Sequence, residues 1–318
     1  MVFLRRVLFA VFSLLLCLLA GEVIIRGYLG YNTVYDMEMT QYALTAKVRS
    51  DNPLIGYTNR PNTTTRLMGV PVHINSDGFR GKEYPVHRSE KARVILLGDS
   101  FTFGWGVREG DTFADILEAG LNNISPAEVF NFSTGNYNTV QEVNLFLQKG
   151  LKYRPDKVVL FYFINDAEET PKISSFWFLG HSRLISFFWP RVKMLINDHP
   201  GFQDYRFYYS GLYKQDQRGW IAAQKAFLLL RDVCQSNNIE LKVILLPDLH
   251  DLLNYPFQDE QRIVLAFLRE HGIEALDITP HFMGRKDTKE LWVRHDDPHP
   301  GALAHKLIAR YALEFIKK

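Results

Sequence analysis

The sequence predicts an α/β protein: a three-layer sandwich with a five-stranded parallel sheet between helices, preceded by an N-terminal transmembrane helix. Two observations lead to this fold class. From Arg93 onward, apolar runs of strand length alternate with segments of helical periodicity, which is the pattern of a parallel sheet with helical crossovers. Near the N-terminus, residues 7–21 form an uncharged stretch rich in leucine and phenylalanine.

The N-terminal stretch indicates a membrane anchor. Its 15 uncharged residues fall between the core of a signal peptide and a spanning helix of roughly 20 residues. Leu18 and Leu19 occupy positions where a cleavage site needs small residues, so an uncleaved signal anchor is favoured over a cleaved signal peptide. Arg5 and Arg6 precede the stretch and would stay cytoplasmic, which places the rest of the chain in the periplasm or outside the cell.

The chain divides into three expected regions. They are an anchor over residues 1–28, a stalk with a small β excursion over 29–90, and the α/β domain over 91–318. An aromatic-rich insertion over residues 168–219 interrupts that domain and is too long for a plain connection. It is interpreted as packed helices, a lid over the cleft, or a contact with the membrane surface.

The strands and helices of the domain follow in order. Strands are expected over residues 94–97, 129–132, 157–163, 241–246 and 274–278. Helices are expected over residues 113–121, 140–150, 220–236, 262–270 and 302–316. Asp111-Thr112 provides the cap of the first of these helices. The catalytic loops of such a sheet gather at the carboxyl ends of its strands.

Composition narrows the classes of partner. The 318 residues are 47% hydrophobic and 23% charged, and the formal net charge is only +2, without a basic stripe, so nucleic acid is not an expected partner. The 14% aromatic content suits a well-filled core or a cleft facing sugar or lipid. Cys17 lies in the anchor, which leaves Cys234 as the domain's one thiol, expected to be a small buried side chain.

The segment Gly98-Asp99-Ser100 directly follows the first expected strand of the sheet. A serine on a tight turn at the end of a buried strand is how α/β proteins present a nucleophile. Asp99 is expected to brace the turn. Near the C-terminus, Asp296-Asp297-Pro298-His299-Pro300 supplies an imidazole and nearby carboxylates. Such groups activate a serine as general base and orienting acid.

Together with these segments, Gly135 follows the second strand and Asn165 follows the third. The four segments resemble, in order and in rough spacing, the four blocks of the SGNH (GDSL-type) hydrolase family. The resemblance covers residue 93 to the C-terminus except the insertion. Residues 75–81, Asn-Ser-Asp-Gly-Phe-Arg-Gly, are similar to an element of membrane-anchored bacterial members.

The resemblance implies a flavodoxin-like fold and a role for each matching residue. Ser100 would be the nucleophile, His299 its general base, and Asp296 the acid that orients the imidazole. The backbone N–H groups of Ser100 and Gly135 and the side-chain amide of Asn165 would form the oxyanion hole. No metal or cofactor is implied.

Several positions carry an alternative. Asp297 is the alternative to Asp296, which the family's spacing favours. Phe163 stands where the family usually has glycine, two residues before the asparagine, which changes the expected shape of the acyl pocket. Asp248-Leu249-His250, after the fourth strand, either lines the cleft or forms a loop.

Three functions are consistent with the sequence. The first is a serine esterase that removes acyl groups, acetyl in the first instance, from an acylated cell-envelope polysaccharide or another small ester outside the cytoplasm. The second is an O-acyltransferase that uses the same triad to acylate a glycan. The third is an inactive glycan-binding or scaffold protein at the membrane, which predicts the loss of a triad residue.

Overall fold

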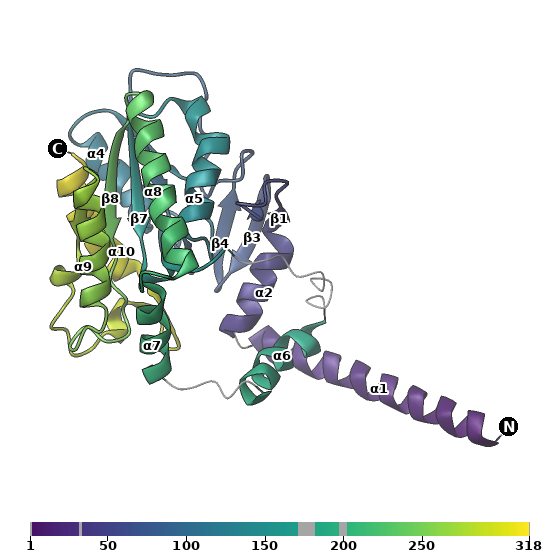
Figure 1. Ribbon diagram of the computed structural model, residues 1–318. Helices are drawn as coiled ribbons and strands as arrows, with labels where there is room; N and C mark the ends of the chain where they lie inside the picture. Colours follow the sequence, from purple (N-terminus) through teal and green to yellow (C-terminus); the bar gives the residue numbers. More distant parts are fainter. Residues whose placement is uncertain (1, 32–33, 171–181, 197–201, 318) are drawn as a thin grey trace. The chain divides into compact units, whose positions relative to one another are not determined.

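The computed structural model describes residues 2–31, 34–170, 182–196 and 202–317. The chain forms two compact units (Figure 1). The first comprises residues 1–46 and 173–200, and the second comprises residues 47–172 and 201–318. The insertion expected over residues 168–219 therefore contributes to both units.

The first unit is helical. Its helices are α1 (Val2–Tyr31), α2 (Tyr35–Thr45) and α6 (Arg183–Ile196). The Glu22 carboxylate of α1 accepts hydrogen bonds of 2.9 Å from the backbone N–H groups of Arg183 and Leu184, which are unsatisfied donors at the start of α6. Residues 2–29 of α1 are long and apolar enough to cross a membrane.

The second unit contains the predicted sheet, with strand order β6-β5-β7-β8-β9. All four neighbouring pairs are parallel. The strands are β5 (Ala92–Leu97), β6 (Ala127–Asn131), β7 (Lys157–Tyr162), β8 (Glu240–Leu245) and β9 (Glu274–Asp277). The five residues after Lys157 in β7 are all buried, as expected for a strand that is covered on both faces.

Helices connect these strands and cover the sheet. They are α4 (Phe113–Asn122), α5 (Thr139–Leu145), α8 (Arg218–Ser236), α9 (Gln258–Glu270) and α10 (Ala302–Ile316). Helix α4 packs against α10, and α5 packs against α8. Thr112 caps α4 by accepting a hydrogen bond from the Asp115 backbone N–H, which agrees with the predicted cap. The predicted α/β fold class is confirmed.

Shorter elements complete the second unit. The region before the sheet folds into two antiparallel pairs, β1 (Lys47–Arg49) with β2 (Tyr57–Asn59), and β3 (Thr63–Leu67) with β4 (Val70–Ile74). Helix α7 (Phe202–Leu212) precedes α8, and the hairpin of β10 (Trp292–Arg294) and β11 (Asp297–Pro300) precedes α10.

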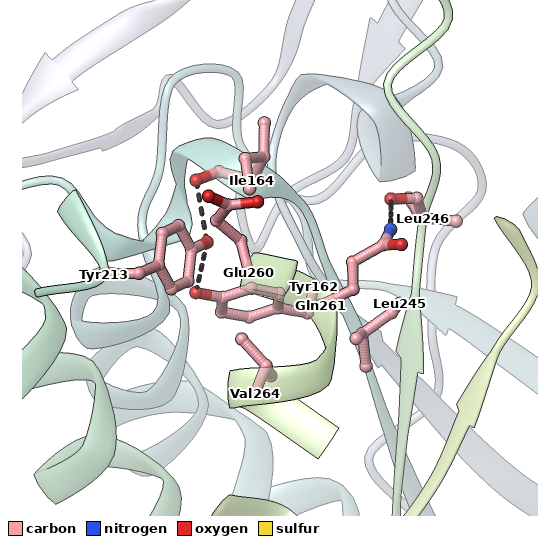
Figure 2. Close-up of a pocket in the computed structure, with 8 residues that line it drawn as sticks. All are labelled: Tyr162, Ile164, Tyr213, Leu245, Leu246, Glu260, Gln261 and Val264. Carbon is pink, nitrogen blue, oxygen red and sulfur yellow. Dashed lines mark hydrogen bonds between the residues drawn. The ribbon is translucent and has the colours of Figure 1, made fainter. Parts of the chain in front are cut away.

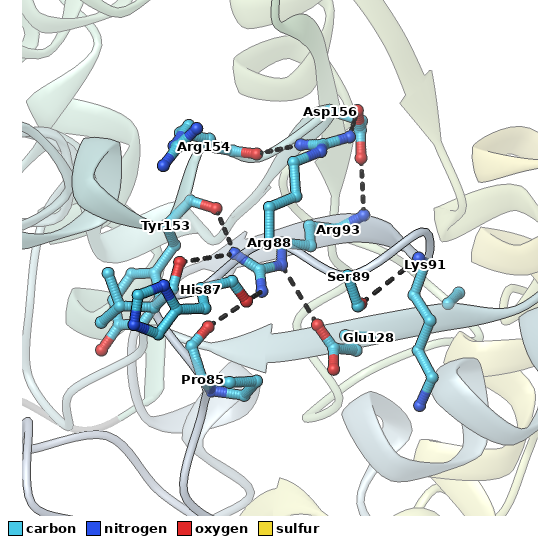
Figure 3. Close-up of polar contacts among 12 residues, drawn as sticks. Pro85, His87, Arg88, Ser89, Lys91, Arg93, Glu128, Tyr153, Arg154 and Asp156 are labelled. Carbon is cyan, nitrogen blue, oxygen red and sulfur yellow. Dashed lines mark hydrogen bonds and ion pairs between the residues drawn. The ribbon is translucent and has the colours of Figure 1, made fainter.

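The buried Arg93 at the start of β5 fastens the preceding loop to the sheet (Figure 3). Its guanidinium donates to the carbonyl oxygens of Pro85, His87 and Tyr153 at 2.9, 2.6 and 2.7 Å. It also pairs with the Glu128 carboxylate on β6 at 3.1 Å. A buried charge is tolerated when its donors are satisfied, so Arg93 acts as a structural clamp.

Candidate active site

The nucleophile turn joins β5 to the short helix α3 (Ser100–Phe103). Asp99 caps α3, because its Oδ1 accepts a hydrogen bond of 2.8 Å from the Phe101 backbone N–H. The turn needs glycine at position 98, where a Cβ atom would lie 2.0 Å from Thr102 Oγ1. These contacts hold Ser100 directly beyond the carboxyl end of a buried strand, as predicted.

His299 lies against this serine although 199 positions separate them. Ser100 Oγ is 2.9 Å from His299 Nε2, and the serine is 4% exposed. The other ring nitrogen, Nδ1, is 2.6 Å from Asp297 Oδ1. Trp105 donates its indole N–H to Asp297 Oδ2 at 3.1 Å. The structure therefore contains a continuous chain of Ser100, His299 and Asp297.

The prediction of Asp296 as the orienting acid is wrong, and the adjacent Asp297 takes that place. Asp297 and His299 belong to strand β11, where side chains two positions apart share a face. Asp296 precedes the strand and is exposed, and its carboxylate pairs with Arg294 at 3.0 Å instead. Because of this alternation, the aspartate two positions before the histidine, and not the one three positions before it, lies beside the imidazole.

Asp297 is ionised in this arrangement. Burial alone would raise its pKa, but hydrogen bonds from His299 and Trp105 outweigh that effect and hold the pKa of Asp297 below its ordinary value. The carboxylate thus favours the His299 tautomer with a proton on Nδ1, so that Nε2 faces the serine as an acceptor.

The loop that carries Gly135 is attached to the nucleophile turn. The Thr134 backbone N–H donates to the Gly98 carbonyl at 3.2 Å. On the outer side of the loop, the Gly135 carbonyl accepts hydrogen bonds from Lys47 Nζ at 2.8 Å and from the Tyr57 hydroxyl at 3.3 Å. The antiparallel pair β1–β2 therefore holds the loop of the predicted oxyanion-hole glycine against the sheet.

Asn165 lies in the turn η3 (Ile164–Ala167) beyond β7. Its side-chain amide donates to Asp99 Oδ2 at 3.3 Å, which places it beside the residue that precedes the nucleophile. The turn is anchored from below, where the Tyr213 hydroxyl donates to the Ile164 carbonyl at 2.9 Å and lies 2.8 Å from the Tyr162 hydroxyl (Figure 2). The adjoining cavity of about 10 Å³ holds at most a single water.

Three buried carboxyl groups lie beneath these loops. Burial raises the pKa of Asp99. Burial, followed by repulsion from the Asp99 carboxylate, raises the pKa of Glu142 well above its ordinary range, and burial with repulsion from Glu142 and Asp99 does the same for Asp166.

Sequence reasoning missed three contributors to the site. Trp105, between two glycines just after the nucleophile, gave a local signal that was not used. Lys47 and Tyr57 donate hydrogen bonds to the Gly135 carbonyl, at least 78 positions away in the sequence, and no local sequence pattern predicts such a contact. Among the residues that the structure describes, no group of three or more His, Cys, Asp or Glu side chains is arranged to hold a metal ion.

A parallel sheet with a hydrogen-bonded serine, histidine and aspartate at its carboxyl edge is an arrangement found in serine hydrolases, and the family match that follows makes this chain a serine ester hydrolase. The model of the GDSL-like lipase/acylhydrolase family matches residues 96–307, and the chain belongs to this family. The predicted resemblance is thereby confirmed.

Solved structures similar to this chain include three hydrolase-family proteins. A catalytic mutant of an acetylxylan esterase from Geobacillus stearothermophilus is 13% identical, with 74% of this chain and 97% of that chain covered and a TM-score of 0.47. A lipase/acylhydrolase from Enterococcus faecalis is 13% identical, with coverages of 71% and 95% and a TM-score of 0.44. A member of the lipolytic G-D-S-L family from Veillonella parvula is 14% identical, with coverages of 71% and 99% and a TM-score of 0.42. No curated protein is significantly similar to the chain.

Proposed function

We propose that this protein is a membrane-anchored esterase that removes short acyl groups, acetyl in the first instance, from acylated glycans of the cell envelope. The observation that carries the proposal is the contact of 2.9 Å between Ser100 Oγ and His299 Nε2, with Asp297 behind the imidazole. This arrangement argues against an inactive scaffold, which would have lost a member of the chain.

The reaction begins when Ser100 Oγ attacks the ester carbonyl carbon while His299 Nε2 takes the hydroxyl proton. The Asp297 carboxylate stabilises the imidazolium ion that results. In the proposed oxyanion hole, the Ser100 and Gly135 backbone N–H groups and the Asn165 amide stabilise the negative oxygen of the intermediate. His299 then returns the proton to the leaving alcohol, and a water molecule, activated by His299, releases the acyl group from the serine.

Two aromatic side chains beside the nucleophile favour a short acyl group. The rings of Phe101 and Phe163 lie 4.1 Å apart, and Phe101 lies 5.4 Å from the His299 ring. Phe163 stands where the family usually has glycine, so its ring fills space that glycine would leave to the substrate. An acetyl group needs little of that space, whereas a long acyl chain needs most of it.

The test uses the full chain in a mild detergent, with 4-nitrophenyl acetate and 4-nitrophenyl octanoate as substrates and a fluorophosphonate probe as a label for the nucleophile. We expect a preference for the acetate, and a loss of at least about 10³-fold in kcat together with loss of labelling in Ser100→Ala. Ser236→Ala, at the exposed end of α8, is the matched control and should behave as the wild type. Labelling that persists in Ser100→Ala would refute the nucleophile assignment.

An assay of acetyl release from acetylated polysaccharides, with and without an added acceptor sugar, separates hydrolysis from acyl transfer.

A further inference from the structure

The second unit contains a second histidine–aspartate pair with the local geometry of the catalytic one. In Asp248-Leu249-His250, as in Asp297-Pro298-His299, the histidine backbone N–H donates to Oδ1 of the aspartate two positions earlier, at 3.0 and 3.1 Å. The Nδ1 atom of the same ring contacts that carboxylate, at 3.0 Å for His250. Each aspartate is buried, with its side chain 1% exposed. In both pairs, therefore, the aspartate orients the imidazole of the histidine two positions later through the same two contacts.

The second pair lies at the same edge of the sheet as the nucleophile. Asp248 follows β8 as Ser100 follows β5, and one strand, β7, separates the two. Neighbouring strands are about 4.8 Å apart, so the two strand ends are roughly 10 Å apart, which is the scale of one sugar ring and its substituents. The hairpin provides a physical link: Trp292 donates its indole N–H to the Leu249 carbonyl at 2.8 Å and pairs with Pro300, the neighbour of His299.

The surroundings of His250 are aromatic and electrically balanced. Its ring centroid lies 4.8 Å from that of Tyr205 and 5.9 Å from that of Trp292. The Tyr205 hydroxyl donates to Asp248 Oδ2 at 2.6 Å, and the neighbouring Arg206 is paired with Asp251 at 2.8 Å. An anionic ligand would meet the carboxylates of Asp248 and Asp251, and the two nearby cations are already engaged. Arg206 pairs with Asp251, and Lys289, 5.8 Å from the Trp292 ring, contacts His295 at 2.9 Å. A lipid chain would desolvate the polar Asp248–His250 pair. Aromatic faces beside a fixed imidazole suit a neutral, hydroxylated ring.

We propose that Asp248, His250, Tyr205 and Trp292 form a subsite that binds a hydroxyl group of a sugar ring on the alcohol side of the ester. The subsite rests on the proposed esterase function and adds the recognition of the leaving alcohol. His250, whose side chain is 26% exposed, supplies the hydrogen bond, and Asp248 fixes the tautomer and orientation of the ring. A site built around such a hydrogen bond discriminates against an analogue that lacks the hydroxyl.

The test compares two esters of the same ring size, a mono-O-acetyl methyl glucoside and cyclohexyl acetate, on the full chain. We expect the wild type to favour the sugar ester in kcat/KM, and this preference ratio to fall at least tenfold in His250→Phe, which keeps an aromatic ring but removes its hydrogen bond. Tyr205→Phe removes only the hydroxyl bonded to Asp248 and should lower the ratio by a smaller factor, which tests the subsite even where His250→Phe folds poorly. His271→Phe, at the end of α9 on the opposite edge of the sheet, is the matched control and should leave the ratio unchanged.

The possible outcomes separate the two proposals. A wild type without activity on 4-nitrophenyl acetate refutes the esterase itself. A wild type that cleaves the aryl ester but does not prefer the sugar ester overturns the subsite alone, as does an unchanged preference ratio in both His250→Phe and Tyr205→Phe.

Discussion

At the scale of single residues, two neighbouring aspartates have opposite environments. Asp297 is buried between His299 and Trp105, whereas Asp296 is exposed beside Arg294. Because both are carboxylates of equal size, the difference between them arises only from their direction relative to strand β11. Substituting each aspartate in turn therefore tests which of the two orients His299 in the proposed mechanism.

Asp297→Asn should lower kcat by about 10³–10⁴-fold, because an amide no longer favours the His299 tautomer that accepts the serine proton. Asp296→Asn should change kcat by less than about twofold, since its exposed carboxylate pairs with Arg294 and not with the His299 imidazole. Steady-state hydrolysis of 4-nitrophenyl acetate, with circular dichroism as the check of folding, measures both. The reverse order of effects would restore the assignment made from family spacing.

This pair also shows what a sequence leaves undetermined. Gly98-Asp99-Ser100 and His299 were found because an apolar run, a tight turn and a proline-framed histidine are local patterns. The choice between Asp296 and Asp297 depends on where strand β11 begins, and a four-residue strand has too few residues to reveal its period. The contacts of Lys47 and Tyr57 with the Gly135 loop arise only from the tertiary fold.

At the scale of elements, a buried histidine joins two of the helices that cover the sheet, α4 and α10. His305 on α10 accepts a hydrogen bond of 2.9 Å at Nδ1 from the backbone N–H of Phe113, the first residue of α4. That N–H is one of the donors that a helix cannot satisfy by itself. Burial, assisted by the positive charge of Arg80, lowers the pKa of His305 to about 3. The ring is therefore neutral in the folded protein.

This contact should make stability depend on pH. Below pH 6.5 the unfolded chain gains a proton on His305 that the folded protein does not bind, so stability falls as the pH drops from about 6.5 towards 3. Between pH 7 and pH 5 the loss from this residue is about 2 kcal/mol. Urea unfolding of the wild type and His305→Asn at both pH values measures it. The variant should be less stable at pH 7 but lose about 2 kcal/mol less on acidification; equal losses would show that His305 is protonated in the fold.

The succession of strands and helices along the chain could be predicted, but some of their ends could not. The alternation of apolar and amphipathic segments located all five strands and the helices between them. The expected helix over residues 140–150 instead has its α-helical part at 139–145 and continues as a wider turn over 146–150. Apolar periodicity locates a helix but does not distinguish such changes in its winding.

At the scale of the whole molecule, the apolar helix and the catalytic unit imply different environments. Residues 2–29 of α1 are long and apolar enough to span a bilayer and are mostly exposed, whereas the apolar side chains of the unit over residues 47–172 and 201–318 gather in a buried core. If the proposed function holds, an anchor in α1 would keep the enzyme next to the envelope glycans that we propose as its substrates. The insertion shows the limit of sequence reasoning at this scale. Its aromatic residues left packed helices, a lid and a membrane contact as alternatives, and gave no sign that α6 and α7 belong to different units.

The proposed anchor predicts that the full chain stays with the membrane and keeps its N-terminus. The segment between Arg6 and Glu22 has 15 residues, all uncharged, which make about 22 Å of helix against a hydrocarbon core of about 30 Å. We therefore expect the side chains of Arg5 and Arg6 to extend toward the lipid headgroups. The full chain should resist carbonate extraction and retain Met1 by mass spectrometry, while a chain without residues 2–31 should be soluble. A C-terminal alkaline phosphatase, which is active only outside the cytoplasm, should be active on the full chain and less active after Arg5→Glu and Arg6→Glu, because cytoplasmic positive charge sets the orientation. If carbonate instead releases a shortened protein, α1 is a cleaved signal peptide. The mature enzyme would then diffuse freely after export.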